Sequence, residues 1–224
     1  MLENLFSLNG KVAVVTGGSR GIGAMIARGY LESGVKTYIT SRNLDELQAT
    51  AKEFSEIGEC IAIQSDLSTM AGVKAFAEAI KAQEQQVHIL VNNAGASWGA
   101  PIDEYPEAGW DKVMDLNVKS IFFLTQQLLP VLRAAGTHED PARVINISSI
   151  NGLANPTLPV YAYSASKAAV INQIRPSNCS ACHRTWASVS GIYIGKLIPG
   201  VGVRFRPVTL DPQTQQQRRG HENR

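Results

Sequence analysis

Short apolar runs alternate with amphipathic stretches over the first three quarters of the chain. Residues 11–16 (KVAVVT) form a β-branched apolar run, which is typical of a strand buried on both faces of a parallel sheet. Similar runs predict four further strands, at 35–41, 60–64, 87–92 and 143–148. The hydrophobic pattern therefore predicts a sheet whose strands are separated along the chain by other elements.

Apolar residues at helical spacing follow each of these strands. Ile22, Ile26 and Tyr30 share one face of the first predicted helix, which should end at Gly34. The other predicted helices cover 44–54, 70–83, Trp110 to about Arg133, and the segment YAYSASKAAV. This alternation favours the α/β class, with one doubly wound parallel sheet of the Rossmann type in a single domain.

Composition and charge narrow the functional classes. The chain has 224 residues with 44% hydrophobic and 18% charged, so we expect a folded domain rather than a disordered chain. A net charge of +2 does not indicate a nucleic-acid partner. Three cysteines cannot form a disulfide framework, which favours the cytoplasm. The start lacks a signal-peptide pattern, and 120–132 is too short to span a bilayer, so no membrane partner is expected.

The composition changes sharply near residue 170. Residues 1–170 carry a net charge of −4, whereas 171–224 carry +6. Pro176 should end the preceding helix, and a strand within 192–205 would be interrupted by glycines and Pro199. We therefore predict a dinucleotide-binding and catalytic domain at 1–170 and an atypical, incomplete tail at 171–224, either disordered or translated from a shifted reading frame. The fifth strand would then lie at the edge of the sheet.

Gly17, Gly21 and Gly23 lie between the first predicted strand and the first helix. Glycines allow a tight turn there and let backbone N–H groups approach a pyrophosphate at the helix N-terminus. Their spacing, G-x-x-x-G-x-G, differs from the usual dinucleotide fingerprint, and such loops often only turn the chain. Because this loop follows the first strand of an alternating α/β pattern, we predict that it binds a dinucleotide.

The end of the second strand indicates which dinucleotide. The sequence there is Thr40-Ser41-Arg42, without the acidic residue that would bind an adenosine ribose hydroxyl. Arg20 in the glycine loop and Arg42 together suit a 2′-phosphate, because guanidinium binds phosphate through two hydrogen bonds. The sequence therefore favours NADP(H) over NAD(H), although both arginines could instead be ordinary surface residues.

Tyr163 and Lys167 are spaced i, i+4 on a predicted helix and so share a face. An ordinary phenol ionises near pH 10, too high for acid–base catalysis at neutral pH. One ammonium about 4 Å away, at an effective dielectric constant of about 20, contributes on the order of 4 kcal/mol, equivalent to about 3 pKa units. The pair could therefore be catalytic, but alone such a spacing is more typical of an ordinary surface pair. Tyr161 has Ala165 at its i+4 position.

These features together resemble the short-chain dehydrogenase/reductase family. The matching motifs, in family order over residues 8–170, are TGGSRGIG at 16–23, Asp66–Leu67, NNAG at 92–95, Asn117 in LNVKS, Ser149 in INISSINGL and YSASK at 163–167. The loop AGASWGAP and the following EYPEAGWDKVMDLNV are similar to the branch that includes the rhamnolipid-biosynthesis 3-oxoacyl reductases. The resemblance implies an enzyme that reduces a small-molecule carbonyl, here a 3-oxoacyl thioester or a ketone, with NADPH.

The resemblance also implies roles for individual residues. Tyr163 would donate a proton to the carbonyl oxygen, and Lys167 would bind the nicotinamide ribose and favour that proton transfer. Ser149 would hydrogen-bond the substrate oxygen, with Ser148 as the alternative, and Asn117 would hold a water that relays protons to Lys167. The residues implied in cofactor binding are Gly17, Ser19, Arg20, Gly21, Ile22, Gly23, Arg42, Asp66 facing the adenine, Leu67, Asn93, Ala94, Gly95, Tyr163 and Lys167.

The tail leaves other expectations open. Family members are homo-oligomeric, but the loss of resemblance after residue 170 puts that interface in doubt. The alternative to an active reductase is a remnant that at most binds nucleotide. Cys179, Cys182 and His183 fall one ligand short of a zinc site, so no metal is expected.

Overall fold

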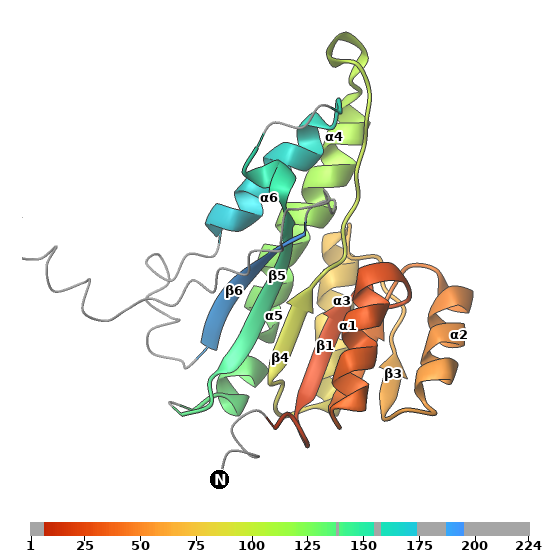
Figure 1. The fold of residues 1–224 in the computed structure, drawn as a ribbon, viewed down its shortest axis with the longest axis vertical. Coiled ribbons are helices and arrows are strands. Elements are labelled where there is room, and N and C mark those ends of the chain that lie inside the picture. Colours follow the sequence, from red (N-terminus) through yellow and green to blue (C-terminus); the bar gives the residue numbers. More distant parts are fainter. Residues whose placement is uncertain (1–6, 138, 155–157, 174–186, 195–224) are drawn as a thin grey trace, which may run out of the picture.

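The computed structural model describes residues 7–137, 139–154, 158–173 and 187–194, and within them six parallel strands form one sheet (Figure 1). The strands are β1 (Val12–Thr16), β2 (Lys36–Thr40), β3 (Cys60–Ala62), β4 (Ile89–Asn92), β5 (Ala142–Ser149) and β6 (Ala187–Ile194). Their order is β3-β2-β1-β4-β5-β6, so the chain reverses its direction across the sheet between β1 and β4. In open α/β sheets, such a reversal is where ligands bind.

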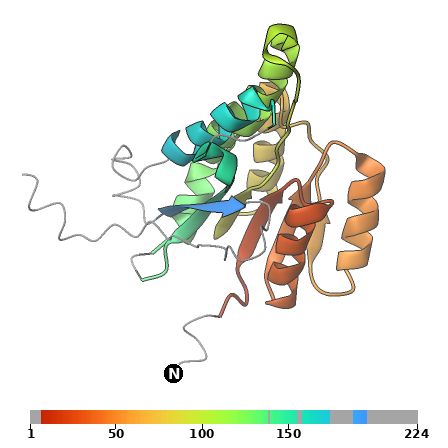
Figure 2. The same ribbon diagram turned by 45° about the horizontal axis from the view of Figure 1, so that its top comes forward.

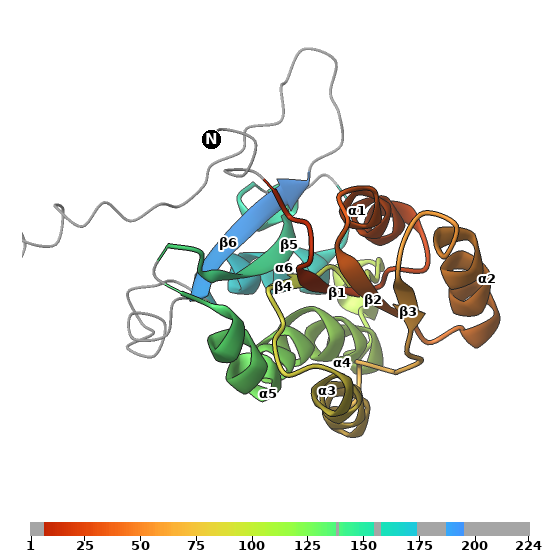
Figure 3. The same cartoon turned by 90° about the horizontal axis from the view of Figure 1, so that it is seen from below.

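Helices cover both faces of the sheet, as predicted from the alternating pattern (Figures 2 and 3). On one face lie α1 (Gly21–Glu32) and α2 (Leu44–Phe54), and on the other lie α3 (Met70–Gln83) and α5 (Ser120–Ala135). Two further helices, α4 (Glu107–Met114) and α6 (Tyr161–Gln173), pack against each other near the carboxyl end of β5. The doubly wound parallel sheet is therefore confirmed.

Two hydrophobic clusters separate the helix layers from the sheet. Val15 and Ile39 pack with Leu31 beneath α1 and α2. Val14 points to the opposite face and packs with Phe76 and other apolar residues beneath α3 and α5. Because successive strand residues are buried on opposite faces, the strands are apolar without interruption rather than alternating.

The structure has a longer helical segment than the one predicted from Trp110 to about Arg133, and its helix type changes along the way. It begins with α4 at Glu107, continues through the π-helical segment Asp115–Lys119 and ends with α5. A π-helical turn widens the helix and changes the direction of its side chains. Asn117 lies in this turn and is fully buried.

The prediction that the fifth strand lies at the edge of the sheet is wrong. β6 pairs with β5 along its whole length, from Ala142 opposite Ala187 to Ser149 opposite Ile194. The eight-residue β5 offers a long row of backbone donors and acceptors. The backbone of β6 can pair with this row even though β6 contains Gly191. The strand also starts five residues earlier than the segment 192–205. Pro176, Pro199 and most of the tail, including 174–186 and 195–224, lie outside the described residues.

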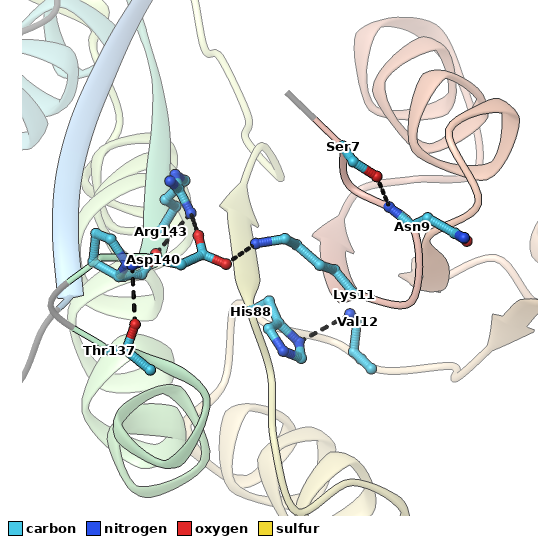
Figure 4. Close-up of polar contacts among 9 residues, drawn as sticks. Ser7, Asn9, Lys11, Val12, His88, Thr137, Asp140 and Arg143 are labelled. Atoms are coloured by element: carbon cyan, nitrogen blue, oxygen red, sulfur yellow. Dashed lines mark hydrogen bonds and ion pairs between the residues drawn. The ribbon is translucent and has the colours of Figure 1, made fainter. Parts of the chain in front are cut away.

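Polar contacts join three strands at the amino end of the sheet (Figure 4). Asp140 forms an ion pair with Lys11, and its other carboxylate oxygen lies 2.8 Å from Arg143 Nη1. Nδ1 of His88 accepts a hydrogen bond of 3.1 Å from the backbone N–H of Val12. Within the described part of the chain, none of the helices has the length and apolarity needed to cross a membrane.

Candidate functional site

The glycine loop between β1 and α1 has the conformation that its sequence predicts. Gly17 and Gly21 have φ values of +65° and +55°, which favour glycine. Gly23 lacks space for a side chain, because a Cβ there would lie 2.5 Å from Asn93 Nδ2 and nearer still to the carbonyl oxygen of Gly17. The three glycines therefore allow the loop to turn and the first turn of α1 to lie close to it.

Gly18 is a fourth structurally required glycine, and the spacing argument overlooked it. A Cβ at Gly18 would lie 2.6 Å from Cγ2 of Ile39, and its N–H donates to the carbonyl oxygen of Thr40 at 3.2 Å. This glycine lets the loop pack directly on β2. The doubled glycine in TGGSRGIG was the available signal.

Thr16 and Asn93 fix the loop to the end of β4. The hydroxyl of Thr16 accepts hydrogen bonds from the N–H groups of Asn93 at 2.9 Å and Ala94 at 3.0 Å. The amide Nδ2 of Asn93 donates to the carbonyl oxygens of Thr16 and Gly17, at 2.9 and 3.2 Å. Asn93 thus supports the glycine loop from beneath, in addition to lining the cleft described next.

A cleft of about 710 Å³ opens at the carboxyl ends of the strands, above the glycine loop. We call it the glycine-loop cleft. The predicted residues that line it are Gly17, Ser19, Arg20, Gly21, Ile22, Gly23, Arg42, Leu67, Asn93, Ala94 and Gly95. Six lining residues were not predicted: Thr40, Ser41, Asn43, Glu46, Ser65 and Leu116. The cleft lies at the N-terminus of α1, and its size suits an extended ligand that carries phosphates.

The charged side chains of the cleft come from the glycine loop and from the start of α2. Arg20 is 83% exposed, and its Nε lies 3.8 Å from Oε1 of Glu46. Arg42 is also exposed. Asn43 caps α2 by accepting a hydrogen bond of 3.2 Å from the N–H of Glu46. The end of β2 carries no acidic residue, but Glu46 places a carboxylate in the cleft.

Asp66 follows β3 and lies in the turn before α3, and its role toward an adenine stays a prediction. Its carboxylate accepts hydrogen bonds from the N–H and the hydroxyl of Ser68, at 3.0 and 2.7 Å. It is exposed and does not line the glycine-loop cleft, whereas its neighbours Ser65 and Leu67 do. The carboxylate stabilises the turn that precedes α3, because Asp readily bonds backbone N–H groups two residues ahead.

α6 brings Tyr163 and Lys167 together on one face. Lys167 is only 4% exposed, and its Nζ lies 5.5 Å from the ring centroid of Tyr163. The ammonium donates a hydrogen bond of 2.8 Å to the carbonyl oxygen of Ile147 on β5. Burial lowers the pKa of Lys167 to about 8. Tyr161 instead packs edge-to-face on Tyr105 and is exposed.

Asn117 is held next to α6 by three hydrogen bonds. Its Oδ1 accepts from the N–H of Ala96 at 2.8 Å, and its Nδ2 donates to the carbonyl oxygen of Ala96 at 2.9 Å. Nδ2 also donates to the hydroxyl of Ser166 at 3.0 Å, which in turn donates to the carbonyl oxygen of Tyr163 at 2.7 Å. The π-helical segment is thereby joined to α6.

The two serines at the end of β5 have different partners from those expected. Ser149 accepts a hydrogen bond of 3.2 Å from the N–H of Asn151, so this serine, and not Ser148, caps the turn after the strand. Ser148 donates to the carbonyl oxygen of Lys167 at 3.0 Å and fixes β5 to α6. The choice of Ser149 as the residue nearer a substrate stays a prediction.

Gly95 joins the glycine-loop cleft to the polar group on α6. It lines the cleft, and a Cβ on it would lie 3.3 Å from Asn117 Oδ1 and 3.8 Å from Lys167 Nζ. The absence of a side chain keeps the approach from the cleft to Lys167 open. The sequence motifs that are far apart along the chain therefore meet at one edge of the sheet.

Within the described residues, no group of three or more His, Cys, Asp or Glu side chains is placed to bind a metal ion. Cys179, Cys182 and His183 lie outside those residues.

This fold and this site define the class of the protein. Residues 11–200 match the family described as short chain dehydrogenase, so the chain belongs to that family of oxidoreductases. The match continues 30 residues beyond position 170, where the motif resemblance was expected to end. The extension includes β6, in agreement with the pairing of β5 and β6.

Two of the similar solved structures are complexes with NADP. The chain is 51% identical over 165 residues to the rhamnolipids biosynthesis 3-oxoacyl-[acyl-carrier-protein] reductase of Pseudomonas aeruginosa, covering 74% of this chain and 64% of that protein. The matched part is thus less than two thirds of that relative's length. The structure of a Pseudomonas aeruginosa RhlG/NADP active-site complex superposes with a TM-score of 0.81, at 45% identity, covering 87% of this chain and 75% of that one. A gluconate 5-dehydrogenase from Burkholderia cenocepacia, in complex with NADP and tartrate, gives a TM-score of 0.77 at 28% identity, covering 87% and 74%.

Proposed function

We propose that this chain reduces a carbonyl group to an alcohol with NADPH. The observation that carries the proposal is the position of Lys167, which is buried against the ring of Tyr163 and lies close to Gly95, a residue that lines the glycine-loop cleft. A buried ammonium beside a phenol is suited to proton transfer, and a cleft at a helix N-terminus is suited to a dinucleotide. The two features meet at the carboxyl edge of the sheet.

The residues of the cleft fit NADP(H). Gly17, Gly18 and Gly23 lie where a side chain would fill the loop, so a pyrophosphate can approach the backbone and the N-terminus of α1. Arg20 and Arg42 are the basic side chains of the lining, and they would bind a 2′-phosphate. When bound, the reduced nicotinamide supplies a hydride to the carbonyl carbon. The NADP complexes of the similar structures support the same assignment.

The side chains around Tyr163 would supply the proton. The hydroxyl of Tyr163 would donate it to the carbonyl oxygen as that oxygen gains negative charge. The charge of Lys167 would favour the ionised phenol, and its Nζ would bind the nicotinamide ribose. Ser149 would hydrogen-bond the substrate oxygen, and Asn117 would hold a water that returns protons to Lys167.

Burial lowers the pKa of Lys167 to about 8, so its ammonium loses its proton in the range around pH 8. Because only the charged ammonium supports the ionised phenol, reductase activity should fall as the pH rises through this range.

The substrate class that we propose is a 3-oxoacyl thioester. The support is the 51% identity to the Pseudomonas aeruginosa 3-oxoacyl reductase and the exposed apolar side chains on two loops. Ile102, Leu153 and Leu158 are exposed on the loops that follow β4 and β5. Those loops contact each other, since the N–H of Ala100 donates to the carbonyl oxygen of Pro159 at 3.2 Å. An apolar acyl chain could pack there.

A second candidate is a chain that binds the nucleotide and does not turn over a substrate. It is favoured by the change in composition near residue 170, where the net charge goes from −4 in residues 1–170 to +6 in residues 171–224. Oligomerisation, which the family resemblance implies, and a cytoplasmic location also remain proposals.

The deciding experiment combines binding with turnover. Titration of NADPH, followed by protein fluorescence, should give saturable binding in the wild type and in Tyr163→Phe. Oxidation of NADPH with a 3-oxoacyl thioester should occur in the wild type and fall by at least about 10²-fold in Tyr163→Phe, because the proton donor is lost. Tyr161→Phe is the matched control on the same helix and should keep its activity.

Three results would count against parts of this proposal. Turnover that survives in Tyr163→Phe would mean that another group supplies the proton. Binding without turnover in the wild type would favour the second candidate. Failure to bind either nicotinamide dinucleotide would refute both.

A further inference from the structure

Glu46 is the one acidic side chain among the residues that line the glycine-loop cleft. It lies in the first turn of α2 with its side chain 30% exposed. Its Oε1 is 3.8 Å from Nε of Arg20 and accepts a hydrogen bond of 3.4 Å from the hydroxyl of Ser19. The carboxylate therefore contacts the glycine loop at the residues next to the proposed phosphate site.

The position of Glu46 matters because of the charges around it. Arg20 and Arg42 are the basic residues of the lining, and Glu46 is close to the first of them. A phosphate that binds Arg20 must share the guanidinium with this carboxylate or displace it. The phosphate would also lie near a charge of its own sign, whereas a ribose hydroxyl at the same place would not be repelled.

We propose that Glu46 is a specificity-determining residue that weakens the preference of this chain for NADP(H) over NAD(H). This inference rests on the proposed function, because it assumes that the 2′-phosphate binds beside Arg20. Glu46 acts through its charge: it holds Arg20 in an ion pair and repels the phosphate. This repulsion weakens the binding of NADP(H), which carries the 2′-phosphate, and not that of NAD(H). The ratio of the two affinities therefore becomes smaller.

The opposite role would be structural. Glu46 could position Ser19 and Arg20 so that they bind the phosphate better. The two roles predict opposite signs when the charge is removed but the shape is kept. Glu46→Gln does this, because its amide oxygen can still accept the hydrogen bond from Ser19.

The test measures dissociation constants of NADPH and NADH for the full chain by calorimetry. In E46Q, NADPH should bind more tightly by on the order of threefold to tenfold, and NADH should change by less than about twofold. The gain for NADPH should shrink when the ionic strength is raised from low values to about 0.5 M, because the repulsion is screened.

Asp45→Asn is the matched control. Asp45 precedes Glu46 in the same first turn of α2 and is exposed, but it does not line the cleft. D45N changes the net charge of the chain and the charge at the N-terminus of α2 by the same amount as E46Q. It therefore controls for both of these effects. It should leave the ratio of the two dissociation constants unchanged.

Several outcomes overturn the inference. NADPH that binds more weakly in E46Q would assign the structural role to Glu46. An equal change for both dinucleotides, or an equal change of the ratio in D45N, would show that the local charge does not discriminate. If the wild type prefers NADPH and E46Q has the same two dissociation constants as the wild type, only this inference is refuted. A wild type that binds neither dinucleotide refutes the proposed function and the inference with it.

Discussion

Two glycines in α1 should respond in opposite ways to the same substitution. Gly23 lies in the first turn of the helix, against the glycine loop, and Gly29 lies further along the helix on its exposed side. A Cβ at Gly23 would lie 2.5 Å from Asn93 Nδ2 and 2.8 Å from the carbonyl carbon of Gly17. A Cβ at Gly29 would meet nothing within 4 Å.

The magnitudes follow from these distances. Ordinary contacts of a Cβ are 3.4–4 Å, so Gly23→Ala requires the glycine loop and α1 to separate by roughly 1 Å. Both neighbours are backbone or firmly bonded, because Asn93 Nδ2 donates to two carbonyl oxygens. Overpacking of this kind costs about 1–3 kcal/mol. Gly29→Ala replaces a poor helix former on an exposed face, so it should stabilise the fold by up to about 1 kcal/mol.

Urea denaturation of both variants measures the free energy of unfolding, and titration with NADPH measures binding. G23A should unfold at lower urea and bind NADPH at least about tenfold more weakly, since a shift of 1 Å in the loop disturbs its N–H groups. G29A should unfold at higher urea with unchanged binding. The pair shares the helix and the chemistry of the substitution, so only the surroundings differ.

A G23A protein with wild-type stability and wild-type NADPH affinity would refute the reasoning. It would mean that the loop is free to move away from α1, and that its close approach to Gly23 is not needed for binding.

Most of the sheet could be predicted because the strands are buried on both faces. Residues such as Val14 and Val15 contact opposite helix layers, which requires both to be apolar and makes the run conspicuous. β6 was missed for a different reason. Its partner is the free edge of β5, and pairing with an existing strand depends on backbone groups that no side-chain pattern reveals.

The parts of the site that depend on a fixed spacing along the sequence could be predicted. The parts that depend on how distant elements pack together could not. Tyr163 and Lys167 are four residues apart because one turn of helix separates them, and that is visible in the sequence. The burial of Lys167 and its hydrogen bond to Ile147 come from the packing of α6 on β5. Glu46 reaches the glycine loop only because α1 and α2 lie side by side, which the sequence does not state.

Three further predictions concern parts of the fold away from the cleft. Tyr38→Phe should lower the free energy of unfolding by about 1.5 kcal/mol in urea denaturation, because the buried tyrosine donates a 2.6 Å hydrogen bond to the carboxylate of Glu84. Iodoacetamide at pH 8 should label Cys60 far more slowly in the folded than in the unfolded chain, as measured by peptide mass spectrometry, because burial raises the pKa of this thiol to about 11. His88 should make stability depend on pH: burial first, and then the charge of Lys11, lower its pKa below the usual 6.5, so the unfolded chain binds more protons than the folded chain as the pH falls below that value. The contribution is therefore complete above about pH 6.5 and is lost under more acidic conditions, where the charged imidazole can no longer accept the N–H of Val12. His88→Asn keeps an acceptor there without a titrating group, and its free energy of unfolding should fall less than that of the wild type between pH 8 and pH 5; equal losses would show that the histidine does not titrate in this way.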